Sequence, residues 1–157
     1  MALDFDLELA TPVPVQQVAA QVHAVAAGFG AFDSTVTAAD LLDGTRTVSD
    51  MWVRVLASTT QPRSPVAEDF GFMPNVRVTF RLGKFTDTVM QQDDMARLCA
   101  GVLERVPGDA VLHFQFEVIW LLRRNGVLTL NERDDVWRPE RLAAVHLPYQ
   151  RATHTFE

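Results

Sequence analysis

Residues 3–9 read LDFDLEL and residues 76–82 read VRVTFRL, so apolar and polar residues alternate in both segments. A β-strand sends successive side chains to opposite faces, and each segment therefore predicts a strand that is buried on one face only. Residues 112–118 (LHFQFEV) repeat the pattern, and residues 51–55 (MWVRV) follow it more loosely. If the four strands share one sheet, one face is apolar and the other is charged. We expect the charged face to carry the function.

Two longer segments show the periodicity of amphipathic helices. Apolar residues recur at helical spacing over residues 13–27, and again from a cap at Thr86 or Asp87 through Val106. Cys99 lies on the apolar stripe of the second segment. We therefore expect it to be a buried, reduced thiol rather than a nucleophile.

The remaining segments are shorter or less regular. In chain order they predict a helical turn opened by a capping box at Thr37–Asp40, a strand or hairpin over 45–57, a surface loop over 58–69, a strand over 74–83, a strand over 110–123, a type I′ turn at Asn125-Gly126, a strand over 127–131 and a short helix over 139–145. This order predicts a single α+β domain over residues 1–157. Its simplest form packs two helices on one face of a largely antiparallel sheet, as a ferredoxin-like βαββαβ core with an added C-terminal hairpin.

Charge is distributed unevenly along the chain. The net charge is −6, and no Lys or Arg precedes Arg46. Six of the 20 acidic residues lie before Arg46, so the remaining 14 balance the 14 basic residues. Non-specific nucleic-acid binding is disfavoured, because it depends on cations that neutralise phosphates. The acidic segment could instead attract a basic partner protein.

Other classes of protein are disfavoured by missing patterns. No apolar run approaches the roughly 18 residues that a membrane-spanning helix needs, and the N-terminus lacks the basic and apolar regions of a secretory signal. We therefore expect a cytoplasmic protein without a membrane partner. A phosphate-binding glycine loop, a nucleophile elbow and metal-ligand spacing are also missing, so we predict no cofactor, no metal site and no catalytic residue.

The charged halves of the predicted strands form the candidate site. Opposite charges paired across strands would stabilise the sheet by roughly 0.2–1 kcal/mol each, so one interpretation is a solvated, ion-paired surface. The other is a partner-binding face that also exposes Trp52, because Trp and Arg are enriched at binding hot spots. The candidate residues are Asp4, Asp6, Glu8, Arg54, Arg77, Arg81, His113, Gln115 and Glu117. A second candidate patch consists of Glu132, Asp134 and Asp135.

Two other functions fit the same pattern. His113 and Glu117 would lie on one side of a single strand, where they could act as acid and base in a small hydrolase or isomerase. The run Val118–Leu122 is apolar on both faces, so it could pair two copies in a homodimeric ligand-binding module. Cover by a C-terminal tail that contains Trp137 and Tyr149 is the alternative explanation of this run. The oligomeric state expected is thus a monomer or a weak dimer.

Several segments resemble a known family. They are residues 1–10 (MALDFDLELA), 69–74 (DFGFMP), 92–95 (QDDM), 106–124 (VPGDAVLHFQFEVIWLLRR) and 130–135 (LNERDD). Together they are similar to actinobacterial members of the swarming-inhibition (Sit-type) immunity family, third class. The resemblance implies a small, cytoplasmic, non-enzymatic protein that binds and neutralises a cognate toxin domain and so protects the producing cell and its kin. It implies neither particular functional residues nor the activity of the toxin.

Overall fold

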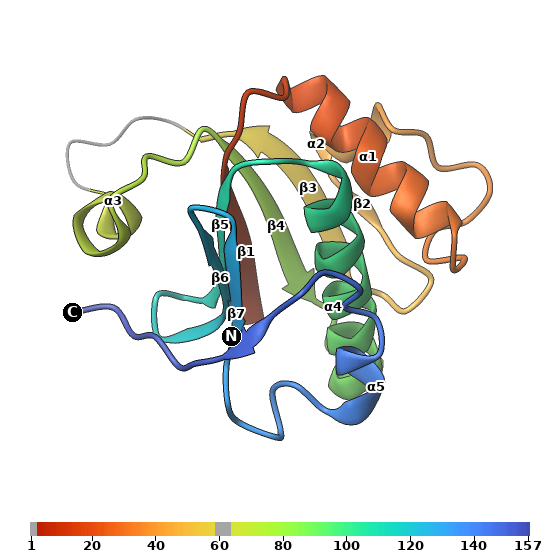
Figure 1. Cartoon of the computed structure of the whole chain (residues 1–157). Coiled ribbons are helices and arrows are strands. Elements are labelled where there is room, and N and C mark those ends of the chain that lie inside the picture. The colour runs from red at the N-terminus through yellow and green to blue at the C-terminus, as the bar shows by residue number, and fades with distance from the viewer. Residues whose placement is uncertain (1–2, 59–63) are drawn as a thin grey trace.

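An eight-stranded sheet forms the centre of the computed structural model, which describes residues 3–58 and 64–157 (Figure 1). The strand order is β2-β3-β4-β1-β5-β6-β7-β8, and all neighbours are antiparallel except β7 and β8. The strands are β1 (Leu3–Ala10), β2 (Thr45–Arg46), β3 (Trp52–Ala57), β4 (Val76–Leu82), β5 (Asp109–Phe114), β6 (Val118–Arg124), β7 (Val127–Leu130) and β8 (Gln150–Arg151). The helices are α1 (Val15–Ala27), α2 (Asp40–Asp43), α3 (Pro65–Phe70), α4 (Thr88–Arg105) and α5 (Pro139–Leu142).

The predicted α+β class is confirmed, and α1 and α4 contact each other on one face of the sheet (Figure 1). Every second residue of β1 and β4 enters the core beneath them, so Phe5, Leu7, Val78 and Phe80 are buried. The specific ferredoxin-like arrangement stays a prediction. In the part of the chain that the structure describes, no helix has the length and apolar character to cross a lipid bilayer.

Small side chains let α1 and α4 approach closely. A Cβ atom at Gly101 of α4 would overlap the side chain of Val25 on α1. As predicted, α4 begins after Asp87, whose carboxylate accepts a hydrogen bond from the N–H of Val89 at 2.9 Å. The predicted burial of Cys99 is confirmed, and this burial raises the pKa of the thiol.

Three predicted local features are confirmed, by hydrogen bonds, by strand pairing and by backbone angles respectively. Thr37 N–H donates to Asp40 Oδ2 at 2.8 Å, and Asp40 N–H donates to Thr37 Oγ1 at 3.4 Å, which is the reciprocal capping box. Residues 45–57 form a hairpin, the second of the two predicted options, because β2 pairs with β3. Asn125 and Gly126 have φ of 52° and 79°, as a type I′ turn requires.

The predicted single strand over residues 110–123 is wrong, because a tight turn separates β5 from β6 within it. Gln115 and Phe116 have φ of 51° and 59°, and Glu117 N–H donates to the carbonyl of Phe114 at 2.8 Å. Positive φ is uncommon at residues other than glycine, so the composition carried no turn signal. The alternation of residues 112–118 therefore continues through a chain reversal.

The predicted surface loop over residues 58–69 is also wrong, because its last part forms α3. Ser64 Oγ accepts a hydrogen bond from the N–H of Ala67 at 3.3 Å and caps this helix, while residues 59–63 lie outside the described residues. α3 lies on the side of the sheet opposite α1 and α4 (Figure 1), and its Phe70 is buried in a cluster with Val111 of β5 and Ile119 of β6. Packing thus stabilises a helix too short to form alone.

Candidate partner-binding face

The sheet face opposite α1 and α4 carries the polar residues of β1, β3 and β4. The register of β1 against β4 places Asp4 opposite Arg81, Asp6 opposite Thr79 and Glu8 opposite Arg77. The predicted pairing of charges across these strands is confirmed for Asp4 with Arg81 and for Asp6 with Arg77, whereas Glu8 pairs with His113 of β5 instead. Part of this surface is accessible to solvent, and we call that part 'the ionic face'. Its residues are Asp4, Asp6, Trp52, Arg54, Arg77, Thr79 and Arg81.

Arg81 forms a two-bond ion pair within the ionic face. Its Nε donates to Asp4 Oδ1 at 2.8 Å and its Nη2 donates to Asp4 Oδ2 at 3.2 Å. The hydrogen bonding to Asp4 raises the pKa of Arg81. The guanidinium also lies 5.7 Å from the centroid of the Trp52 ring, within cation–π distance. Because the pair is exposed it contributes about 1 kcal/mol at most, so its main effect is to orient Arg81.

Asp6 is also engaged by side chains of the neighbouring strand. Thr79 Oγ1 donates to Asp6 Oδ1 at 2.7 Å, and Arg77 Nε lies 3.9 Å from the same oxygen. Among the described residues, that buried Nε of Arg77 has no hydrogen-bond partner. Arg54 Nε donates to the carbonyl of Leu42 at 3.3 Å and so links β3 to α2. The carboxylates of the ionic face are therefore largely neutralised from within.

Glu8 and His113 form a buried pair, so the expectation that they lie on the solvated face is wrong, while their role in partner binding stays a prediction. His113 Nε2 lies 2.7 Å from Glu8 Oε2, and His113 Nδ1 accepts a hydrogen bond from Phe116 N–H at 3.1 Å. Since an accepting nitrogen carries no proton, the ring is protonated at Nε2 and donates to Glu8. His113 is 0% exposed and Glu8 is 8% exposed. Glu8 is therefore the carboxylate that holds His113, while Glu117 lies exposed in the turn after β5 rather than beside His113 on one strand.

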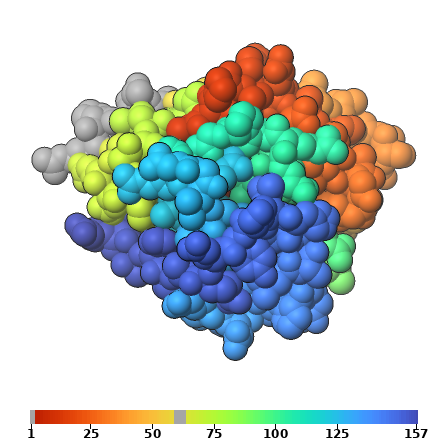
Figure 2. All heavy atoms as spheres, viewed as in Figure 1, coloured from red at the N-terminus to blue at the C-terminus, as the bar shows by residue number. Residues whose placement is uncertain are grey.

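A cover over β5 and β6 explains this burial. Figure 1 shows α3 on the side of the sheet away from α1 and α4, and Figure 2 shows the dark blue C-terminal segment on the surface just below the yellow-green α3. The ring of Phe156 in this segment meets the ring of His113 edge-on at 5.4 Å. Beneath this cover lies an apolar cluster that is separate from the core under α1 and α4. Its buried residues are Val66, Phe70, Phe72, Val111, Ile119 and Leu122. The predicted open face is therefore limited to β1, β3 and β4.

The other candidate residues lie apart from the ionic strands. Gln115 and Glu117 are exposed in the turn between β5 and β6, so they do not continue a row from His113. The residues of the second candidate patch are all exposed: Glu132, Asp134 and Asp135. Asp135 accepts hydrogen bonds from Arg133 Nε and Nη2 at 3.0 and 2.7 Å, and these lower its pKa.

Sequence reasoning missed two buried arginines, Arg123 and Arg141. Arg141 Nε donates to Asp93 at 2.6 Å, and its guanidinium lies 5.3 Å from the Trp120 ring. An arginine in a short polar stretch carries no sequence signal of burial. Trp137 Nε1 donates to the carbonyl of Trp120 at 2.6 Å, which confirms the predicted cover by Trp137, whereas Tyr149 is exposed. β6 also pairs with β5 and β7 along both edges, so it offers no free edge to a second copy.

The described residues offer charge and hydrogen bonds rather than a metal centre. Within residues 3–58 and 64–157, no group of three or more His, Cys, Asp or Glu side chains is placed to hold a metal ion. The ionic face instead presents guanidiniums, carboxylates and one indole ring on a hydrogen-bonded sheet. Such a surface suits recognition of another macromolecule.

Comparison with known proteins identifies the family. A family model described as SitI3-like matches residues 3–141, which include every strand of the sheet except β8. No curated protein and no solved structure shows a significant match to the chain. The C-terminal segment that covers His113 lies beyond the matched residues. Because the match spans most of the sequence, the chain belongs to the SitI3-like family.

Proposed function

We propose that this protein is a non-enzymatic immunity protein, which binds and neutralises one cognate toxin domain and protects the producing cell and its kin. Membership of the SitI3-like family is the observation that carries this proposal. We further propose that it acts in the cytoplasm, without a nucleic-acid, membrane or cofactor partner.

The ionic face is the surface that we assign to the toxin. Its residues stand on three hydrogen-bonded strands, so binding would cost little ordering of backbone. Arg81 is oriented by Asp4 and by Trp52, and its side chain remains 53% exposed. Paired charges of this kind contribute more to partner choice and to the rate of encounter than to affinity. Glu8 and His113 would act indirectly, because they hold the turn that carries Gln115 and Glu117.

The test of neutralisation requires a candidate toxin, and we would first search the adjacent genes for a product that ends in a toxin-like domain. We expect co-expression of the chain to restore growth of a bacterium that produces this domain, and we expect the two proteins to co-purify. The proposed function fails for this pair if growth is not restored and no complex is recovered, although both proteins are produced in soluble form.

Charge reversal tests the assigned face. The double variant Arg54→Glu and Arg77→Glu changes two guanidiniums of the ionic face, and we expect it to weaken binding by about tenfold or more. The matched control is Arg105→Glu, because Arg105 is exposed at the end of α4 on the opposite side of the sheet. Equal affinities for the double variant and the control would assign the interface elsewhere, while leaving the immunity function intact.

A further inference from the structure

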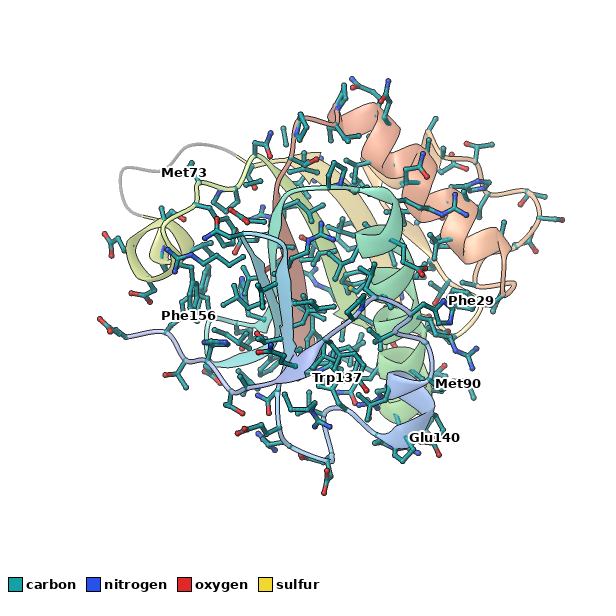
Figure 3. All side chains as sticks on the ribbon, viewed as in Figure 1. Phe29, Met73, Met90, Trp137, Glu140 and Phe156 are labelled. Atoms are coloured by element: carbon teal, nitrogen blue, oxygen red, sulfur yellow. The ribbon has the colours of Figure 1, made fainter. Side chains whose placement is uncertain are left out.

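Three exposed apolar side chains lie where the chain passes from β4 into α4, beyond the end of β4 that carries Arg81. Phe85 is 96% exposed, Met90 is 53% exposed and Val89 is 39% exposed. Figure 3 shows Met90 on the side of α4 that points away from the sheet. Aromatic residues and methionine are enriched in the centres of protein interfaces. An almost fully exposed phenylalanine therefore suggests a surface that a partner covers.

The loop that carries Phe85 is held in place by a buried glutamine. Gln91 of α4 is 0% exposed, and its Oε1 accepts a hydrogen bond from Gly83 N–H at 2.7 Å. Its Nε2 donates to the carbonyls of Gly83 and Thr86 at 3.0 and 3.2 Å. The loop is thus clamped on both sides of Phe85. Little conformational entropy remains to be lost when a partner covers this ring.

A groove of about 350 Å³ runs beside Phe85 towards the ionic face. Three cations line it, Arg46, Arg81 and Lys84, against one carboxylate, Asp50. Arg46 is engaged by Asp50 at 3.2 Å, whereas Lys84 forms no ion pair among the described residues. The groove is therefore locally cationic in a protein whose net charge is −6.

The neighbouring carboxylates Asp4, Asp87 and Asp94 keep their negative charge, but they do not line the groove. Asp87 turns its carboxylate to the N–H of Val89, where it caps α4. Asp94 accepts a hydrogen bond from Ser49 Oγ at 2.7 Å, and Asp4 is engaged by Arg81. Arg46 and Arg81 of the lining are each paired with a carboxylate, so within the described residues Lys84 is the lining cation that forms no ion pair.

From these observations we propose that the groove binds an acidic segment of the toxin partner, with an apolar side chain of that segment packed on Phe85 and a carboxylate on Lys84. The inference rests on the proposed immunity function for the identity of the partner. An acidic inhibitor is usually expected to bind a basic surface of its toxin. Here the proposed contact is the reverse, because the groove is lined mainly by cations.

A peptide titration tests the chemistry of the groove without the toxin. The probe is a blocked pentapeptide of alternating glutamate and leucine, and the control probe is the same peptide with lysine in place of glutamate. We expect the acidic probe to shift the amide resonances of Gly83, Lys84 and Phe85 in a saturable manner, and Lys84→Glu to remove the shift. No shift with the acidic probe, or equal shifts with both probes, overturns the inference.

Binding of such a toxin-like domain then tests the groove in the complex. We expect Phe85→Ala and Lys84→Glu each to raise Kd by about tenfold or more, with unchanged melting temperatures because both side chains are exposed. Val127→Ser, which alters an exposed apolar residue at the other end of the sheet, is the control and should change Kd by less than about twofold. Suppose that the unchanged chain binds the toxin. If both variants then bind it as tightly as the unchanged chain does, or if Lys84→Glu tightens binding, the proposed role of the groove is refuted and the immunity function stands. If the unchanged chain does not bind this toxin, the function fails for the pair, and the peptide titration alone decides on the groove.

Discussion

Arg123 provides the sharpest prediction about what holds this fold together. It lies on β6 and is 7% exposed. Its Nε donates to the carbonyl of Gly108 at 2.7 Å, while Nη1 and Nη2 donate to the carbonyls of Leu103 and Val106, both at 2.6 Å. The last carbonyls of a helix have no partner within the helix. The Arg123 guanidinium therefore caps the C-terminal end of α4, although burial lowers its pKa.

The expected cost of Arg123→Ala follows from these three bonds. Each carbonyl left without a partner costs about 1–3 kcal/mol if water does not reach it. Water will reach some of the space vacated at this helix end, so we take the lower half of that range, about 1–2 kcal/mol for each carbonyl, and expect a loss of about 3–6 kcal/mol in the free energy of unfolding. Arg123→Lys keeps the charge but cannot span three carbonyls, so its loss should be about half as large.

Urea unfolding, followed by tryptophan fluorescence, measures these losses. The control is Arg133→Ala, which removes an exposed pair with Asp135 and should cost about 0.5 kcal/mol or less. A loss below about 1 kcal/mol for Arg123→Ala, with an unchanged dependence on urea, would show that water replaces the three hydrogen bonds. The capping role of Arg123 would then be wrong.

Three further predictions concern other buried or paired groups. At pH 8 the Cys99 thiol should react with iodoacetamide only when urea unfolds the chain. Burial raises the pKa of this thiol, so the folded protein holds less thiolate than the unfolded protein. Rapid alkylation of the folded protein would contradict this prediction. His113→Ala leaves the Glu8 carboxylate buried without its partner and should cost about 3–5 kcal/mol by urea unfolding, whereas adding Glu8→Gln should recover part of the loss. A double-mutant cycle on the free energy of unfolding should give a coupling energy of about 0.2–1 kcal/mol between Asp4 and Arg81, and added salt should reduce it. A coupling energy that does not change with salt would mean that solvent reaches the pair less than its exposure indicates.

Strict alternation predicted the strands that build the ionic face. In β1 and β4, every polar residue of the pattern faces away from the helices and every apolar one enters the core, so position in the sequence determined the face. The pairing of Asp4 with Arg81 followed from the same pattern once the strands became neighbours. Register over long sequence separations still required the structure, because alternation alone fits any shift by two residues.

The errors arose where a local signal was missing. Gln115 and Phe116 take the positive φ of a tight turn without glycine or asparagine, so residues 110–123 looked continuous. The Ser64 cap of α3 was overlooked because polar and proline residues around it also fit a loop. The burial of His113 depends on Phe156, and a contact between these positions leaves no periodic trace in the sequence.

One half of the sheet face opposite α1 and α4 is covered and the other half is exposed to solvent, and this difference determines where a partner can bind. On β5 and β6, apolar outward residues such as Val111 and Ile119 require cover, and α3 with the C-terminal segment supplies it. On β1 and β4 the outward residues are polar, and apart from the buried Glu8 they remain in contact with solvent, where Asp4 and Asp6 lie beside Arg81 and Arg77. The acidic N-terminal strand therefore presents few unpaired carboxylates to a partner. The groups available to a partner lie beyond the end of β4. There the Phe85 ring is exposed, and Lys84 has no counter-ion among the described residues.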